Sequence, residues 1–250
     1  MPREVDYDGE IAEAYERGRS LSAEALSTWR AAVEPHIPAA GAIVDIGAGT
    51  GRFARPLSTV SQTKVIAVEP ATGMRSARAD ADADVAWVAG SAEALPLSAA
   101  STGLAWSAFT THYLDLDQAA AEIARVLRPG GRALIWHAFP DVFDDLEWFR
   151  WFPTARAIDE QRMPSASSVE RAFESRGLEF AGRSDHAMQI TPDLAALSDR
   201  LAHRSISTLR LIPDDEFHDG LARLRAAVAN HKYAGPVMVR NVMLRFDKPA

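Results

Sequence analysis

Hydrophobic positions in the first half of the chain follow two alternating patterns. Short apolar runs, which are typical of strands buried on both faces, occur at 42–46, 64–69, 85–89, 103–107 and 132–138. The clearest helical spacing between them is at 117–127, with Asp117 as the expected N-cap. Strands and helices in alternation predict a doubly wound α/β fold, a mostly parallel sheet with helices on both faces.

The segments that flank this core are expected to be mainly helical. Before it, apolar residues at helical spacing predict a helix at 11–18 and a second one after Ser22, with Leu26, Trp29 and Val33 on its inner face. After it, the patterns predict helices at 165–176, 192–207 and 213–230 and strands at 178–189 and 237–246.

Residues 139–152 are rich in aromatic side chains. Aromatic residues make up 8% of the whole chain, yet this stretch contains Phe143, Trp148, Phe149, Trp151 and Phe152. Large aromatic side chains are most often part of a core. Because the stretch follows the last central strand, it would also be placed to form a wall or lid over a ligand, and both interpretations stay open.

Composition narrows the class of protein. The chain has 250 residues, of which 47% are hydrophobic, so it can bury one substantial core. It has no Cys and its seven His are scattered, so we expect neither a disulfide nor a metal site. A formal net charge of −7 without a Lys or Arg cluster argues against a nucleic-acid partner. No apolar run suits a membrane span or a signal peptide, so we expect a cytoplasmic protein that binds a small molecule. Nothing indicates the oligomeric state.

The strand at 42–46 leads into the sequence VDIGAGTG, residues 44–51. Its Gly47, Gly49 and Gly51 leave room for a ligand to approach the backbone and can adopt positive φ at little cost. Residues from Arg52 onwards are expected to begin a helix, whose N-terminus attracts an anionic group. A dinucleotide fingerprint has its third glycine at the sixth position of the loop, where this chain has Arg52.

Together with Glu69, the acid that ends the next strand in VIAVE, this loop resembles the first two motifs of class I S-adenosylmethionine-dependent methyltransferases. Two further stretches agree with the resemblance: SAEALP at 91–96, where the family usually has Asp in place of Ser91, and RVLRPGG at 125–131. The resemblance covers residues 40–138. The chain is similar to the ubiquinone and menaquinone C-methyltransferases and to natural-product methyltransferases.

The resemblance implies a Rossmann-like sheet of seven strands, the last of them antiparallel, in a single methyltransferase domain over residues 1–250. We expect an N-terminal helical cap at 1–38, a cofactor-binding core at 40–138, a substrate-side helical insertion at 139–236 and a last strand at 237–250.

The resemblance also implies which residues bind S-adenosylmethionine. Glu69 would accept both ribose hydroxyls, and the glycine loop would receive the amino-acid end. Asp45 would either brace that loop or meet the ammonium of the cofactor through water. At the adenine, Ser91 with its neighbours would stand in for the usual Asp, and Met74 would pack on the ring. The full expected set is Tyr15, Arg19, Asp45, Gly47, Ala48, Gly49, Gly51, Glu69, Pro70, Met74, Ser91, Ala92, Glu93 and Ser107.

Two histidines are candidates for the chemistry. Methyl transfer from a sulfonium needs an aligned acceptor and the exclusion of water, and it needs a general base only for some acceptors. His112 follows the strand at 103–107, and His137 lies at the end of the strand at 132–138. Each is either an acid or base group or a structural residue.

The sequence therefore predicts an S-adenosylmethionine-dependent methyltransferase (EC 2.1.1.-) that acts on a small-molecule acceptor such as a secondary metabolite and releases S-adenosylhomocysteine. One alternative is a binding protein or cyclase of the same fold that moves no methyl group. The other is an oxidoreductase with a nicotinamide cofactor, against which Arg52 argues. Neither the acceptor nor the methylated atom is indicated.

Overall fold

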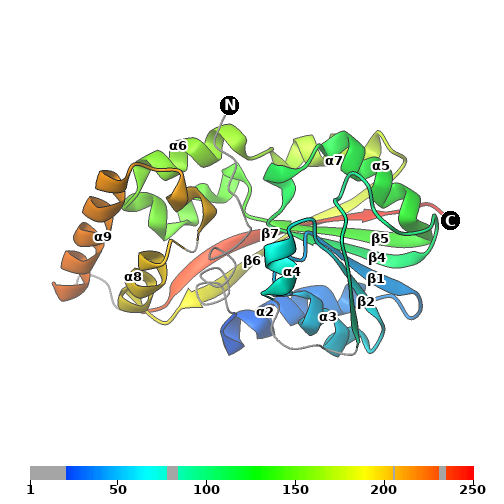
Figure 1. Cartoon of the computed structure of the whole chain (residues 1–250), viewed down its shortest axis with the longest axis horizontal. Coiled ribbons are helices and arrows are strands. Elements are labelled where there is room, and N and C mark those ends of the chain that lie inside the picture. The colour runs from blue at the N-terminus through cyan, green and yellow to red at the C-terminus, as the bar shows by residue number, and fades with distance from the viewer. Residues whose placement is uncertain (1–20, 78–83, 205, 231–234) are drawn as a thin grey trace.

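A seven-stranded sheet forms the centre of the protein, with strand order β3-β2-β1-β4-β5-β7-β6 (Figure 1). The fold comes from a computed structural model, which describes residues 21–77, 84–204, 206–230 and 235–250. β7 runs antiparallel to both of its neighbours, and β1 to β5 pair in parallel, which confirms the expected topology. The strands are β1 Ala42–Ile46, β2 Val65–Val68, β3 Val85–Val88, β4 Thr102–Ala108, β5 Leu127–His137, β6 Glu179–Thr191 and β7 Val237–Asp247.

Helices cover both faces of this sheet. One face carries α2 (Ala23–Val33) and α3 (Ala54–Ser61), and the other carries α5 (Leu116–Val126) and α7 (Ala166–Glu174) (Figure 1). Three more, α6, α8 and α9, gather with η3 and η4 beyond the carboxyl ends of the parallel strands (Figure 1). Their bounds, with those of the short helices, are α4 Thr72–Ser76, α6 Pro153–Arg162, α8 Leu194–Ala202, α9 Asp214–Ala229, η1 Glu34–His36, η2 Thr111–Tyr113, η3 Pro140–Asp145, η4 Glu147–Arg150 and η5 Ser207–Arg210.

Aromatic contacts join the sheet to α2 in the core. The ring of Trp106 on β4 lies 5.8 Å from that of Trp29 on α2 and 6.0 Å from that of Trp136 on β5, and all three side chains are fully buried. Such ring pairs add about 0.5–1.5 kcal/mol each beyond the burial of their surface. This packing holds β4 and β5 firmly, and both strands end at the candidate site.

The last two strands extend past the end of β5. Pairing between β5 and β7 stops at His137 and Val242, whereas β6 and β7 stay paired as far as Thr191 and Val237. Residues 186–191 and 237–241 therefore form a two-stranded extension, with no β5 beside it. This extension lies on the same side of the molecule as α6, α8 and α9 (Figure 1).

Several helix boundaries agree with the sequence, and others needed correction. Ser22 caps α2 as expected, because its Oγ accepts the amide of Ala25 at 3.1 Å. On the same helix Leu26 was expected to be buried but is 36% exposed. The cap of α5 is Asp115 rather than Asp117, since the Asp115 carboxylate accepts the amide of Gln118 at 3.0 Å.

Two element boundaries near the ligand-binding edge also differ from the expectation. The helix after the glycine loop begins at Ala54, two residues later than expected, so Arg52 belongs to the loop. Residues 128–131 do not interrupt β5, which starts at Leu127 with an irregular register against β4. In addition, the sequence patterns missed α6, where Pro153 occupies the first turn.

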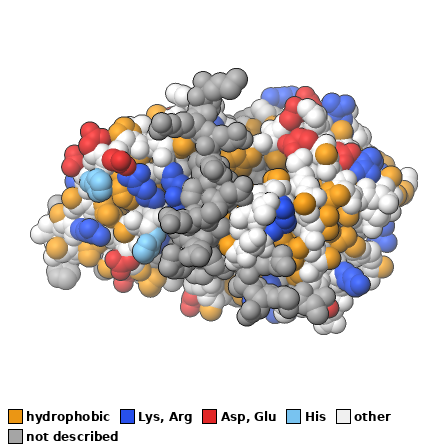
Figure 2. All heavy atoms as spheres, viewed as in Figure 1, with side chains coloured by type: hydrophobic (Ala, Val, Ile, Leu, Met, Phe, Trp, Pro, Cys, Tyr) orange, Lys and Arg blue, Asp and Glu red, His pale blue; other side chains and the backbone are white. Residues whose placement is uncertain are grey.

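Charged side chains are mixed on the surface. Figure 2 shows acidic and basic groups interspersed over the described parts of one face, so the excess of acidic residues is not gathered into one patch there. In the described ranges, no helix combines the length and the apolar character that crossing a bilayer requires.

Candidate functional site

The loop after β1 adopts a conformation that favours glycine at three positions. Gly47, Gly49 and Gly51 have φ values of 69°, 60° and 94°. The amides of Gly47 and Ala48 both donate to the carbonyl of Val68 on β2, at 2.9 and 3.1 Å. The turn is therefore tied to the neighbouring strand, and the alternating glycines predicted from the sequence are a requirement of its backbone.

Two of these glycines also lie against side chains. A Cβ added to Gly47 would come within 2.5 Å of Cγ2 of Thr110, and one added to Gly51 would come within 2.8 Å of Cζ2 of Trp87. Thr110 is itself hydrogen-bonded through its hydroxyl to Ser107, which is buried at the end of β4. Ser107, predicted as a cofactor residue, thus supports the first turn of the loop through Thr110. Neither Thr110 nor Trp87 was singled out in the sequence, because their roles depend on contacts between strands.

Glu69, directly after β2, links the loop to the turn that follows it. Its carboxylate accepts the amide of Gly49 at 2.9 Å and the amide of Ala71 at 2.9 Å, and the side chain is 7% exposed. Burial raises the pKa of Glu69, and the hydrogen bonds from Ala71 and Gly49 oppose that rise. Since each carboxylate oxygen has two lone pairs, both can accept a further hydrogen bond from a ligand.

Asp45 on β1 is buried beneath the same loop. It is 2% exposed, and its Oδ2 accepts no hydrogen bond from the part of the chain that the structure describes. Burial, and to a lesser extent the charge of Glu69, raises the pKa of Asp45 to about 8. A buried acid with an unsatisfied oxygen is suited to a cationic or hydrogen-bond-donating group.

The remaining predicted cofactor residues surround this edge of the sheet. Met74 on α4 and Ala92 in the loop after β3 are buried, whereas Pro70 is exposed. Ser91 is partly buried in a turn closed by the bridge between Ser91 and Ala94. The carboxylate of Glu93 accepts the amide of Asp115 at 3.1 Å, so it faces the start of α5. Tyr15 and Arg19 lie outside the described residues.

A bidentate ion pair on α5 holds the loop after β3 in place. Glu122 and Arg125 are 2.7 Å apart, and the amide of Leu95 donates to Glu122 at 2.8 Å. Arg125 donates in turn to the carbonyls of Leu95 and Leu97, at 3.0 and 2.8 Å. The loop that carries Ser91 and Ala92 is therefore fixed by a helix that sequence reasoning had treated only as a cover for the sheet.

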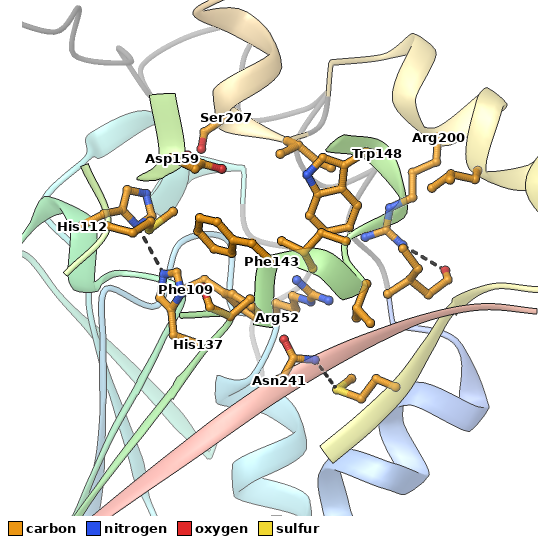
Figure 3. Close-up of a pocket in the computed structure, with 18 of the residues that line it drawn as sticks. Arg52, Phe109, His112, His137, Phe143, Trp148, Asp159, Arg200, Ser207 and Asn241 are labelled. Carbon is orange, nitrogen blue, oxygen red and sulfur yellow. Dashed lines mark hydrogen bonds between the residues drawn. The ribbon is translucent and has the colours of Figure 1, made fainter. Parts of the chain in front are cut away.

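A cleft of about 970 Å³, part of it open to solvent, lies next to the residue that follows the glycine loop (Figure 3). Arg52, which directly follows the loop, lines it, and so do residues from β5, η3, η4, α6, β6, α8 and β7. Phe143 and Trp148 belong to the aromatic stretch and line the cleft, whereas Phe149, Trp151 and Phe152 are buried beside it. The stretch therefore contributes to the core, and that it forms a wall for a ligand stays a prediction.

The two candidate histidines meet at one end of this cleft (Figure 3). Nδ1 of His112 lies 3.3 Å from Nε2 of His137, and Nδ1 of His137 lies 2.9 Å from the carbonyl oxygen of Ala138. His137 is 3% exposed, and the ring of Phe109 lies 5.6 Å from its ring. The sequence placed the two residues on different strand ends, and the fold brings them into contact because β4 and β5 are neighbours.

Arg200 and Asn241 also line the cleft (Figure 3), and sequence reasoning missed both. Arg200 lies on α8, and its Nη1 donates to the carbonyl of Ile190 at 3.0 Å. Asn241 is 2% exposed on β7. No local pattern marks either residue, because only the β6–β7 extension and the return of α8 bring them to the cleft.

Comparisons with known proteins agree on one family. Residues 44–135 match the methyltransferase domain family. A malonyl-[acyl-carrier protein] O-methyltransferase from Methylococcus capsulatus is 39% identical over 176 residues, which is 68% of this chain and 59% of that protein. The chain aligns with 27% to 59% of the lengths of the first curated relatives it matches.

Solved structures share the fold at low sequence identity. A putative methyltransferase from an antibiotic biosynthesis pathway of Anabaena variabilis has a TM-score of 0.63 and 22% identity, over 89% of this chain and 99% of that one. The [4+2]-cyclase SpnF has a TM-score of 0.60 and 20% identity, over 93% of this chain and 84% of that one. These structures show the shared fold. The matched domain and the sequence relatives, together with the glycine loop and the acid after β2, place the chain in the family of class I S-adenosylmethionine-dependent methyltransferases.

Proposed function

We propose that this chain transfers a methyl group from S-adenosylmethionine to a small, mainly apolar acceptor of the kind found among secondary metabolites. The observation that carries the proposal is the position of the cleft, which begins at Arg52, directly after the glycine loop, and has the His112–His137 pair in its wall. A cofactor bound on the loop would place its reactive end at that part of the cleft.

The residues of the loop fit this cofactor. Its amino-acid end would meet the backbone of the loop at Gly47, Gly49 and Gly51, whose positive φ values shape the turn. The unsatisfied Oδ2 of Asp45 would accept from its ammonium, directly or through water, and Glu69 would accept from its ribose hydroxyls. Met74 and Ala92 would supply apolar surface for the adenine. The chemistry that the bound cofactor supplies is a methyl group on a sulfonium, ready for in-line displacement.

The tautomers of the two histidines follow from their partners. The carbonyl of Ala138 can only accept, so Nδ1 of His137 carries a proton. A neutral His137 then has its lone pair on Nε2 and accepts the Nδ1 proton of His112. This leaves a lone pair on Nε2 of His112, which suits it to take the proton of an acceptor hydroxyl, phenol or carbon acid as the methyl group is transferred.

The two roles differ accordingly. His112 is the general base in this proposal, and His137 is a positioning residue that fixes the tautomer and the ring of His112. The proton released from the acceptor ends on Nε2 of His112, and the methyl group ends on the acceptor atom. Apolar side chains such as Phe143 and Leu146 line the cleft and would limit the access of water to this step.

Two measurements on the purified protein test the proposal. Isothermal titration calorimetry with S-adenosylhomocysteine should show one binding site. Incubation with S-adenosylmethionine and a panel of phenols, alcohols and amines, followed by mass spectrometry, should show S-adenosylhomocysteine and a methylated acceptor in equal amounts. Absence of S-adenosylhomocysteine binding would refute the function. Conversion of an acceptor to an isomer without gain of a methyl group would instead favour a cyclase on the same fold.

A further inference from the structure

The part of the cleft remote from the histidines has polar groups that the methyl transfer itself does not require. It is built by the β6–β7 extension, α8 and η4, at Met188, Ile190, Val239, Trp148 and Arg200. On β7, Val239 lies three positions before the Val242 that pairs with His137, which corresponds to about 10 Å along the strand. An acceptor that reaches both ends must therefore be longer than a single ring.

Asn241 contributes a buried amide between these two ends. Its side chain is 2% exposed, and its Nδ2 has the thioether sulfur of Met188 as a partner at 3.3 Å, a weak acceptor. In Figure 3 the carboxamide oxygen points away from Met188 and into the cleft. A buried amide in this setting is suited to hold a polar group of a bound molecule.

Trp148 presents a second buried polar atom. Its Nε1 is out of reach of solvent and has no acceptor within the ranges that the structure describes. The indole lies between Phe143 and Arg200 in the wall of the cleft (Figure 3). Since a buried N–H without an acceptor is unfavourable by about 1–3 kcal/mol, an acceptor oxygen supplied by a bound molecule would be stabilised here.

Arg200 gives this end of the cleft a positive charge. Its Nη1 donates to Ile190, which fixes the guanidinium at the cleft, and a guanidinium has further donors in the same plane. Arg52 adds a second guanidinium to the same wall.

We propose that the acceptor carries an anionic oxygen group, a carboxylate or a phosphate, at the end remote from the methylated atom, held by Arg200 and the indole N–H of Trp148. Asn241 orients the body of the molecule between the two ends, and Phe143 and Leu197 pack against its apolar part. The proposal rests on the proposed function, because it assigns the methylated end to His112. It predicts that anions are favoured in a cleft of a protein whose formal net charge is −7.

A matched pair of fluorescent probes tests this assignment. 8-Anilinonaphthalene-1-sulfonate carries an anionic oxygen group on an apolar body, and 1-anilinonaphthalene is the same body without it. Both are titrated into the protein saturated with S-adenosylhomocysteine. We expect the anionic probe to bind at least about tenfold more tightly than the neutral one, as for a charged hydrogen bond to Arg. Equal affinities would refute the proposal.

Three variants locate the effect. Arg200→Met should lower the affinity for the anionic probe by roughly tenfold and leave the affinity for the neutral probe within about twofold of the wild type. Trp148→Phe, which keeps an aromatic ring and removes the N–H, should weaken the anionic probe by roughly threefold. Arg225→Met on the exposed face of α9 makes the same change of charge outside the cleft and should match the wild type. The assignment is contradicted if Arg200→Met weakens the binding of both probes equally, or if it weakens the binding of neither probe.

Further measurements keep the outcome clear. If Arg200→Met fails to fold, as judged by circular dichroism, Arg200→Lys takes its place, because it keeps the charge and loses the planar guanidinium. The affinity of Arg200→Lys for the anionic probe should lie below that of the wild type and above that expected for Arg200→Met. Displacement of the anionic probe by 1-naphthoate is compared with its displacement by 1-naphthyl phosphate, which distinguishes a carboxylate site from a phosphate site. The uncharged 1-naphthamide should displace the anionic probe poorly. S-Adenosylhomocysteine affinity is measured for each variant. Absence of S-adenosylhomocysteine binding to the wild type would refute the proposed function, whereas the ratio of the affinities for the two probes tests the anion site by itself.

Discussion

The edge proposed to bind the cofactor and the cleft proposed to receive the acceptor are built in opposite ways. The cofactor edge comes from short stretches, chiefly residues 45–51 and 69–74, and depends on bare backbone and two carboxylates. The cleft draws side chains from Arg52 to Asn241. In the proposed function, a loop of consecutive residues would bind the cofactor, which is the same in every reaction of the family. A wall assembled from distant segments could vary with the acceptor without disturbing that loop. The two regions should therefore respond differently to substitution.

The largest effect is expected from the cleft, where we propose that the methyl transfer takes place. His112→Ala removes the proposed base and should lower turnover by about 100-fold to 10,000-fold, with S-adenosylhomocysteine affinity within about twofold of wild type. Steady-state kinetics with an acceptor that needs deprotonation check this. His218→Ala on α9, an exposed position, is the control. A variant that keeps full turnover would exclude His112 from the mechanism.

The next effect tests the cofactor edge through its backbone. Gly47→Ala forces a Cβ to within 2.5 Å of Thr110 at a φ of 69°, and we expect a loss of about 2–4 kcal/mol in the free energy of unfolding, with weaker cofactor binding. Urea denaturation and calorimetry measure both quantities.

Gly177→Ala is the matched control, because Gly177 has a φ of 80° and no neighbour within 4 Å of an added Cβ. It should lose only about 1–2 kcal/mol, the contribution of the backbone conformation alone. Thr110→Ser removes the clashing methyl group and keeps the hydroxyl, so it should rescue part of the Gly47→Ala defect. Equal losses in the two glycine variants would mean that the close contact does not matter.

Glu69→Ala should have a smaller effect, about 1–3 kcal/mol of S-adenosylhomocysteine binding, from the lost hydrogen bonds to the ribose and to the amide of Gly49. Calorimetry gives the affinity. Glu69→Gln keeps an acceptor oxygen and removes the charge, so it separates the contribution of the charge from that of the hydrogen bonds. Unchanged affinity in Glu69→Ala would refute the ribose assignment.

The smallest effect concerns pH and Asp45. Its pKa, raised by burial to about 8, means that the folded protein keeps this carboxyl protonated at pH values where the unfolded chain ionises it. Its contribution to stability therefore falls as the pH rises from about 4 to 8 and is level above 8. The ammonium of the cofactor would favour the ionised form, so affinity should rise toward pH 8, by at most about 1.4 kcal/mol per pH unit.

Calorimetry in two buffers of different ionisation enthalpy measures the proton released on binding of S-adenosylhomocysteine. We expect up to about one proton for the wild type at neutral pH and none for Asp45→Asn. No release in either protein would mean that Asp45 only braces the loop. The experiment thereby decides between the two interpretations that the sequence left open.

The sequence predicted the elements built from consecutive residues better than the cleft, which is assembled from distant segments. β1 was predicted to the residue, because an apolar run of branched side chains ending in glycines has one reasonable structure. The cap of α5 was misplaced, since Asp115 and Asp117 both suit the first turn and only the hydrogen bonds to Gln118 decide between them. Local patterns cannot rank two equivalent caps.

The cleft was beyond prediction for a different reason. Arg200 and Asn241 look like ordinary residues of a helix and a strand, and they become site residues only through contacts between segments far apart in sequence. The sequence could single out His112 and His137 because the first follows β4 and the second ends β5, and parallel strands of this fold end at the same edge. Their contact with each other depends on side-chain orientation, which no periodicity records.

The two-stranded extension beyond β5 offers a route to new acceptors by a change of length rather than of side chains. Within it β7 pairs with β6 alone, so one inserted residue between Val237 and Asn241 would turn the alternate side chains over while leaving the pairs from Val242 onward in register. A single insertion would therefore replace the β7 side chains that line the cleft with those that now point away from it. The proposed binding site for the methyl donor, several strands away, would keep its structure.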